Sequence, residues 1–182
     1  MPELLEKNPY IVDTITWLEK AVIGLNLCPF AKAEHIQGRI HYVVSNATDA
    51  LALLRDFESH AKFLIDQAPE KIETVLLIHP EAMQDFYEYN DFLADAEELL
   101  VDLELDGILQ VASFHPQYQF AGTDPDDREN YTNRSPYPML HLLREESVSR
   151  AVDSFDDPDG IFERNIATLE SLDEADWRAI FK

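Results

Sequence analysis

The stretch Val75-Leu76-Leu77-Ile78-His79-Pro80 decides how the fold is predicted, because a second stretch of the same pattern, ILQVASFHP, occurs at 108–116. Each stretch is a short apolar run that ends in His-Pro, and proline cannot donate a hydrogen bond to a sheet ladder. Both runs are therefore predicted to be strands. If they are parallel strands of one sheet, His79 and His115 emerge at the same edge. Ligands of open α/β sheets bind at the carboxyl ends of the strands, so this edge is the predicted site.

Outward from these two runs, strand and helix patterns alternate. The predicted core consists of three strands and two helices. The strands are 39–44, 73–79 and 108–114, and the helices between them are 47–67 and 81–105. Each helix is long enough to return the chain for a parallel neighbour. A leading helix is expected to begin with Asn8 as its cap and Pro9 in its first turn, and to end at Gly24.

A long polar segment, 115–138, follows the third strand, and loops of this length are often functional. Ser135 and Pro136 predict the start of a helix near 136–150, and a last helix is predicted over 159–181. The expected fold is thus α/β, a single layered domain over 1–182 with a small parallel sheet, a leading helix and two C-terminal helices. A ferredoxin-like α+β arrangement with an antiparallel strand is the alternative.

Composition limits the partners of this 182-residue chain. Its formal charge of −22 argues against nucleic acid and against anionic membrane surfaces, because both repel an acidic protein. Two islands depart from this charge. Residues 20–48 hold three Lys or Arg against one acid, a net of +2, and residues 128–144 do the same. The first island contains Cys28 and the second contains His141. A small anionic molecule is the partner that such islands favour.

Other features of the composition indicate a cytoplasmic protein. No apolar stretch approaches the length of a membrane span, and the N-terminus lacks the layout of a secretory signal. A single cysteine excludes an intrachain disulfide and fits a reducing compartment. A narrow sheet has two edges, one of which a second copy could cover, so a monomer and a homodimer are both compatible with the sequence.

The candidate catalytic residues are His115, His79, Cys28 and His141. A neutral imidazole moves protons near neutral pH or binds a metal, and a cysteine thiolate is a nucleophile when its pKa is lowered. The alternative for each histidine is a strand end whose ring bonds a nearby carbonyl. The alternative for Cys28 is a small buried hydrophobic side chain.

An anion pocket is predicted from Arg134 and Arg144. On the helix expected near 136–150, His141, Arg144 and Glu145 share one face, and Arg134 arrives from the loop just before it. Arginine matches the geometry of carboxylate and phosphate groups. The alternative is an exposed helix face with ordinary charge pairs.

Metal binding stays open in the sequence. The four residues Cys28, His79, His115 and His141 would suit zinc, and a divalent transition metal is a possible cofactor. None of them has the close spacing that marks a specific metal motif. The metal ligands are therefore unknown at this point.

Three motifs resemble one family across nearly the whole chain. They are WLEKAVIGLNLCPFA at 17–31, FHPQYQFAG at 114–122 and NRSPYP at 133–138. The chain is similar to the bacterial domain-of-unknown-function family numbered fourteen-fifteen. This resemblance implies a bacterial single-domain protein of about this length, and it assigns no activity. Tyr118 and Asn133 lie within these motifs and complete the predicted ligand-binding set with Arg134 and Arg144.

The function that these observations favour is an enzyme for a small anionic metabolite, with its pocket at the strand ends. Two alternatives remain. The first is a ligand-binding or sensing module that uses the same pocket without chemistry. The second is an acidic protein-interaction module, in which the acidic helix over 81–105 meets a basic partner.

Overall fold

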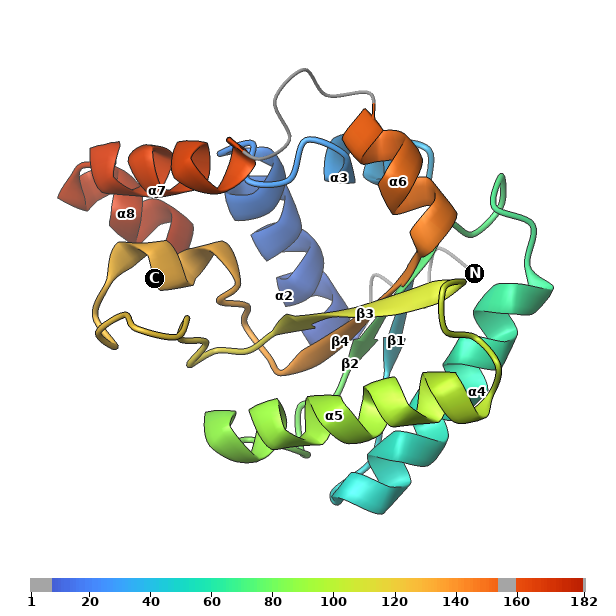
Figure 1. Ribbon diagram of the computed structural model, residues 1–182. Helices are drawn as coiled ribbons and strands as arrows, with labels where there is room; N and C mark the ends of the chain where they lie inside the picture. Colours follow the sequence, from blue (N-terminus) through green and yellow to red (C-terminus); the bar gives the residue numbers. More distant parts are fainter. Residues whose placement is uncertain (1–7, 154–159, 182) are drawn as a thin grey trace.

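The structure, a computed structural model, describes residues 8–153 and 160–181. Over these residues the chain has an α/β fold, as predicted, with one open four-stranded sheet and helices on both of its faces (Figure 1). The strands stand in the order β1-β2-β4-β3 and have these bounds: β1 Ile40–Val44, β2 Thr74–Ile78, β3 Leu109–Phe114 and β4 Met139–Arg144.

The sheet is mixed. β1 and β2 are parallel, whereas β4 is antiparallel to both of its neighbours, β2 and β3. The three strands predicted from the sequence therefore run in the same direction, and the antiparallel β4 lies between the second and the third. The carboxyl ends of β2 and β3 consequently lie at one edge of the sheet, which is the arrangement predicted from the two His-Pro pairs.

The prediction of a helix over 136–150 is wrong in its first half. Residues 139–144 form β4, and α6 (Glu145–Asp153) begins only after it. Leu140 and Leu142 pack on one face of the sheet while Met139 packs on the other, which is the alternation of a strand. Leucine and methionine favour helices locally, but the gap between β2 and β3 supplies hydrogen-bond partners on both sides, and this tertiary context overrides the propensity.

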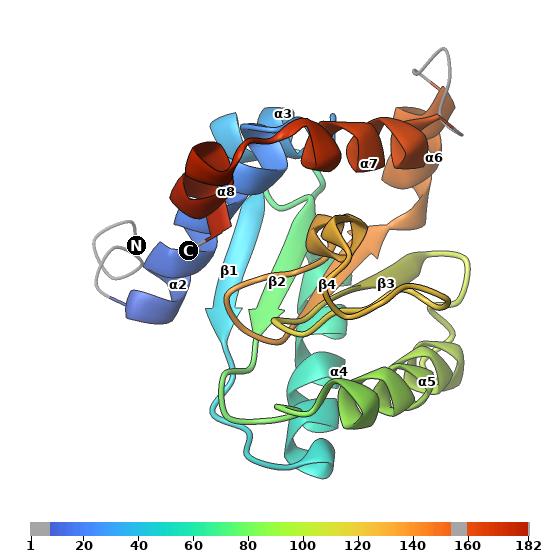
Figure 2. The same cartoon turned by 90° about the vertical axis from the view of Figure 1, so that its left-hand side faces the viewer.

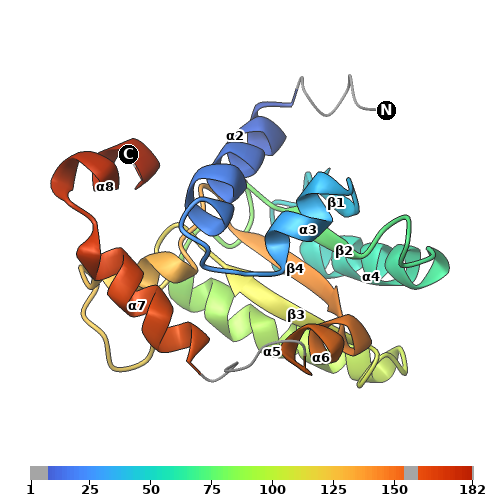
Figure 3. The same ribbon diagram turned by 90° about the horizontal axis from the view of Figure 1, so that it is seen from above.

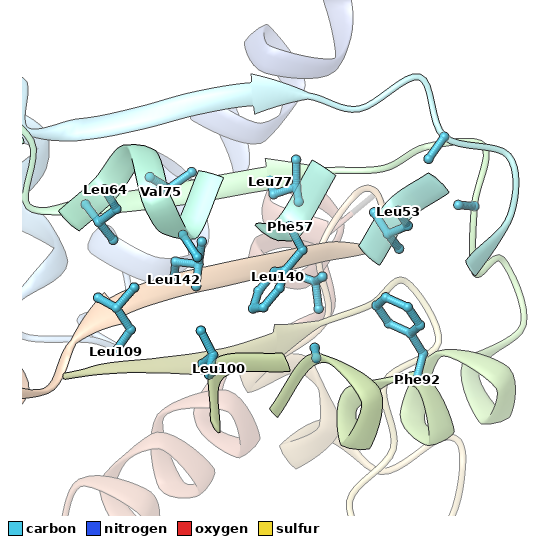
Figure 4. Close-up of a cluster of buried hydrophobic side chains, with 14 of the residues drawn as sticks. Leu53, Phe57, Leu64, Val75, Leu77, Phe92, Leu100, Leu109, Leu140 and Leu142 are labelled. Atoms are coloured by element: carbon cyan, nitrogen blue, oxygen red, sulfur yellow. The ribbon is translucent and has the colours of Figure 1, made fainter. Parts of the chain in front are cut away.

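The larger core lies on the face of the sheet covered by α4 (Ala50–Asp66) and α5 (Phe86–Asp102). Aspartates cap both helices, since Asp49 accepts the Ala52 N–H at 2.8 Å and Asp85 accepts the Tyr87 N–H at 2.9 Å. Figure 4 shows their apolar side chains meeting those of the strands in one layer, including Phe57. At about 25 cal/mol per Å² of apolar surface removed from water, this layer is a main source of stability.

The opposite face is covered by elements from both ends of the chain (Figure 2). α2 (Pro9–Trp17) starts at the predicted cap, where Asn8 Oδ1 accepts the Tyr10 N–H at 3.0 Å. The remaining elements on this side are η1 (Leu18–Ile23), α3 (Ala31–Ile36), η2 (Arg128–Thr132), α6, α7 (Ile161–Ser171) and α8 (Glu174–Phe181). The helix predicted over 159–181 is thus two helices, and its first residue lies outside the described residues.

Within residues 8–153 and 160–181, no helix combines the length and the apolar character that crossing a membrane requires.

Candidate functional site

The two imidazoles that follow β2 and β3 meet at one edge of the sheet. Both pack on the ring of Tyr89 from α5, with centroid distances of 5.8 Å for His79 and 5.1 Å for His115. The Tyr89 hydroxyl also ties the strand ends together, because it donates to Met139 O at 2.8 Å and accepts the Phe114 N–H at 3.1 Å. All three rings are buried. The edge that the sequence predicted is therefore a packed aromatic cluster.

The hydrogen bonds of both histidines engage main-chain groups. Nδ1 of His115 accepts the Gln117 N–H at 3.0 Å, so the proton lies on Nε2, which donates to Met83 O at 3.2 Å. Nδ1 of His79 donates to Ala82 O at 3.0 Å, and its Nε2 has no hydrogen-bond partner among the described residues. Burial lowers the pKa of His115 and lowers that of His79 to about 4. Both rings are neutral at pH 7 and anchor the loops that follow their strands.

Asn133 and Tyr118 hold the long loop between β3 and β4 against the strand end. The Asn133 carbonyl accepts the His115 N–H at 3.2 Å, and its Nδ2 donates to Ser113 O at 3.0 Å. The Tyr118 carbonyl accepts a hydrogen bond from Arg134 Nε at 3.0 Å. The structure thus brings Tyr118, His115, Asn133 and Arg134 together, with the first three supporting the loop that carries the arginine.

Arg134 is fixed on this loop by two of its three nitrogens. Besides the bond from Nε, Nη2 donates to Pro125 O at 2.6 Å, and the guanidinium lies over the Tyr131 ring at 4.5 Å. Nη1 has no hydrogen-bond partner among the described residues. A guanidinium held in this way is preorganised, so a ligand that binds Nη1 does not need to order the side chain.

A cleft of about 390 Å³ opens beside Arg134. Three segments of the chain line it: the first helix with its continuation η1, the long loop, and α8, which packs against η1. Figure 3 shows where α2 and α8 lie when the molecule is seen from above. The lining residues are Asp13, Thr16, Trp17, Lys20, Pro116, Tyr131, Arg134, Ser135, Pro136, Ala179, Ile180 and Phe181. Its size falls within the range of small-molecule sites, about 300–1,000 Å³.

The charge of this cleft is opposite to that of the chain. The whole sequence has 36 acids against 14 Lys and Arg, whereas Lys20 and Arg134 face a single acid in the cleft, Asp13. Oδ2 of Asp13 accepts the Tyr137 hydroxyl at 2.6 Å. Lys20 is exposed and has no ion-pair partner among the described residues. One base from each of the two positive islands of the sequence therefore reaches the same cleft.

Trp17 also lines this cleft. Its side chain is 9 % exposed, and its indole Nε1–H is buried without a hydrogen-bond partner among the described residues. An unpaired buried donor costs about 1–3 kcal/mol. Trp17 is thus a lining residue of the cleft whose ring nitrogen lies in the packed interior.

The helical repeat explains how the first helix presents these groups. Asp13, Thr16, Trp17 and Lys20 follow the i, i+3, i+4, i+7 spacing that places side chains on one helix face. This spacing is visible in the sequence, yet Trp17 and Lys20 were absent from the predicted site residues. A helix face made of both polar and apolar residues is also typical of a surface helix, so the spacing alone did not mark them.

Lys20 lies in η1, a π-helical turn of six residues. Such turns are rare and frequently occur at functional sites. The Gly24 N–H donates to Glu19 O at 3.0 Å, five residues back, and this bond closes the turn. A Cβ at Gly24 would come within 2.2 Å of Lys20 O, so only glycine fits here without a backbone shift. Gly24 thus ends the first helix, as predicted, and sets the position of the Lys20 backbone.

His141 and Arg144 lie on β4 instead of on a helix, so the predicted polar strip of His141, Arg144 and Glu145 is wrong. Three residues apart on a strand, the two side chains point to opposite faces of the sheet. The Thr74 hydroxyl donates to Leu142 O and accepts a hydrogen bond from His141 Nε2 at 2.6 Å. Burial lowers the pKa of His141 to about 4.

Arg144 caps a helix in the structure. Its Nη2 donates to Leu64 O at 2.6 Å and to Gln67 O at 2.8 Å, which are carbonyls of the last turn of α4 and its cap. Cations are favourable at this negative end of a helix dipole. Arg134 and Arg144, which were predicted to share an anion, therefore lie in separate parts of the structure with separate partners.

Cys28 lies between η1 and α3. It is partly buried against the apolar core on the face of the sheet opposite α4 and α5. Across residues 8–153 and 160–181, no three His, Cys, Asp or Glu side chains gather closely enough to hold a metal ion. The candidate metal ligands Cys28, His79, His115 and His141 thus form no common site in the described part of the chain.

A second cleft of about 360 Å³ adjoins the first, with Arg134 and Pro116 lining both. Its other charged residues are Asp85 and Asp126. Arg134 therefore separates a cleft that contains a further base from one that contains acids, and an anionic ligand is favoured only in the first.

Comparison with known proteins yields one match. The model of a family described as "Protein of unknown function (DUF1415)" matches residues 10–179. Neither the curated proteins nor the solved structures contain a match to the chain.

Proposed function

Because the chain belongs to the DUF1415 family, whose description assigns no activity, we propose from the geometry alone that it binds a small anionic molecule beside Arg134. The ligand is a carboxylate or a phosphate. One observation carries the proposal: in a chain of net charge −22, this cleft holds two bases against one acid, and that acid already accepts a hydrogen bond from Tyr137.

The donors of the cleft differ in kind and fit one anion together. Nη1 of Arg134 supplies a charged N–H in a fixed position. Lys20 supplies a mobile ammonium that approaches from the exposed rim. Hydrogen bonds between charged donors and carboxylate or phosphate oxygens are roughly twice as strong as neutral ones, so such a set favours anions over neutral ligands.

The same geometry supports binding over turnover. His79 and His115, the leading catalytic candidates, bond main-chain groups and do not line either cleft. A general acid or base has to reach its substrate within hydrogen-bond distance. We therefore propose the binding or sensing module in preference to the enzyme, in a cytoplasmic bacterial protein.

The test is calorimetric titration with orthophosphate and, separately, with succinate. Two single variants with the same change of net charge are compared. Lys20→Ala removes one of the two bases of the cleft, and Lys32→Ala removes an exposed lysine of α3 that does not line it. We expect Lys20→Ala to weaken binding about threefold to tenfold, equivalent to about 1 kcal/mol, and Lys32→Ala to change it little.

Three results would count against the proposal. If neither anion binds at millimolar concentration, the cleft is not an anion site. If both variants weaken binding equally, the effect comes from the overall charge. If a bound compound is recovered chemically changed after incubation, the protein is an enzyme and the binding module is the wrong choice.

A further inference from the structure

We propose that the anion has an apolar body, so that the ligand is an aryl or alkyl phosphate or carboxylate rather than a bare inorganic ion. This inference rests on the proposed function and specifies the class of ligand. The charged group would meet Lys20 and Arg134 Nη1, and the body would lie against the wall that α8 and the prolines of the long loop form.

The composition of the wall supports an apolar body. Seven of the twelve lining residues are apolar or aromatic, and they come from all three segments. Ile180 and Phe181 belong to α8, and Pro116 and Pro136 to the loop. A bare phosphate would contact the donors and leave this surface in water. Ligand sites typically combine an apolar lining with a few polar groups that orient the ligand, which is the pattern here.

The wall is also rigid. Phe181 packs edge-on against Tyr131 with a centroid distance of 5.0 Å and against Trp177 at 4.7 Å. Arg128 holds α8 in place, because its guanidinium stacks on the Trp177 ring at 4.5 Å and its Nη1 donates to Leu172 O at 2.7 Å. A preformed apolar surface costs little conformational entropy when a ligand binds.

The volume of the cleft agrees with a body of this kind. A water molecule occupies about 30 Å³ of liquid, so a cleft of about 390 Å³ has room for roughly a dozen groups of that size. Orthophosphate fills less than half of this space. A phosphate or carboxylate that carries one six-membered ring fills most of it.

The experiment compares phenyl phosphate with orthophosphate by calorimetry on the whole chain. We expect phenyl phosphate to bind about tenfold or more tightly, since its ring is removed from water. In Ala179→Phe the new side chain occupies the body region from an exposed helix position, and this gain should vanish while orthophosphate binding persists. The control is Ala175→Phe, which places the same side chain one turn earlier on α8, where the residue is exposed and does not line the cleft.

A second variant, Ile180→Ala, removes part of the wall and should reduce the gain several-fold without affecting orthophosphate. Equal affinities for the two probes would overturn this inference and leave the anion site intact. A gain that survives in Ala179→Phe would also overturn it, because the ring would then lie elsewhere. If neither probe binds, the proposed function itself fails.

Discussion

Acidification from pH 7 to pH 5 should destabilise the protein through His79. This ring is fully buried, donates from Nδ1 to Ala82 O and packs on Tyr89. Its pKa in the fold is about 4, against about 6.5 for an unfolded histidine. Since the folded value is the lower one, the unfolded chain binds the proton first as the pH falls. The stability that the neutral ring contributes is thus present above pH 6.5 and is lost progressively between pH 6.5 and 4.

The magnitude follows from the shift. A lowering of about 2.5 pKa units corresponds to about 3 kcal/mol when the loss is complete, and to about 2 kcal/mol between pH 7 and pH 5. This is a large part of the 5–15 kcal/mol that stabilises a typical domain. The 36 acids also titrate in acid, so the contribution of His79 has to be measured as a difference.

The assay is urea unfolding of the wild type and of His79→Gln at pH 7 and at pH 5. Glutamine keeps an N–H donor near Ala82 but does not titrate, and the acids are common to both proteins. We expect the wild type to lose about 2 kcal/mol more than the variant over this interval. Nitrogen NMR should show His79 neutral at pH 6 with its proton on Nδ1. Equal losses in the two proteins, or a doubly protonated His79 at pH 6, would refute the assignment.

Two further predictions concern Gly24, which supports the site, and Arg144, which lies apart from it. Gly24→Ala should destabilise the fold by about 1–3 kcal/mol, measured by urea unfolding, because its Cβ would lie 2.2 Å from Lys20 O; a loss below about 0.5 kcal/mol would show that the π-helical turn adapts. Arg144→Met should cost about 2–4 kcal/mol, because it leaves carbonyls at the end of α4 without a donor. It should leave phosphate affinity unchanged, and a tenfold weaker affinity would return Arg144 to the ligand site.

The sequence identifies the strand edge correctly because local signals define it. A β-branched apolar run stopped by proline specifies a strand end wherever it occurs, and two such ends predicted that His79 and His115 come together. Both lie on Tyr89 in the structure. The chemistry of this edge is harder to predict from the sequence, since the hydrogen-bond partners of the two rings are main-chain groups that only the folded loops supply.

β4 could not be predicted from its own residues. Met139-Leu140-His141-Leu142-Leu143-Arg144 contains no β-branched residue, and its apolar positions also fit a helix. Its strand state depends on β2 and β3, which are distant in the sequence. The misplaced helix then produced the wrong grouping of His141 with Arg144.

The anion cleft was partly predictable. Arg134 was among the predicted site residues, and the structure places it in the cleft together with Lys20, a base of the other charge island. The unpaired indole N–H of Trp17 was not predictable, because it lacks a partner only in the packed structure. No pattern in the sequence reveals which buried group remains unpaired.

The position of β4 in the middle of the sheet has a consequence for synthesis on the ribosome. Among residues 8–153 and 160–181, β3 pairs with β4 alone, and β4 is the strand that joins β3 to the β1–β2 pair. While residues 139–144 remain inside the exit tunnel, β3 has emerged as a strand with no partner, and the layer over α5 stays incomplete. The sheet can therefore close only after residues 139–144 have left the tunnel, when β4 inserts between β2 and β3.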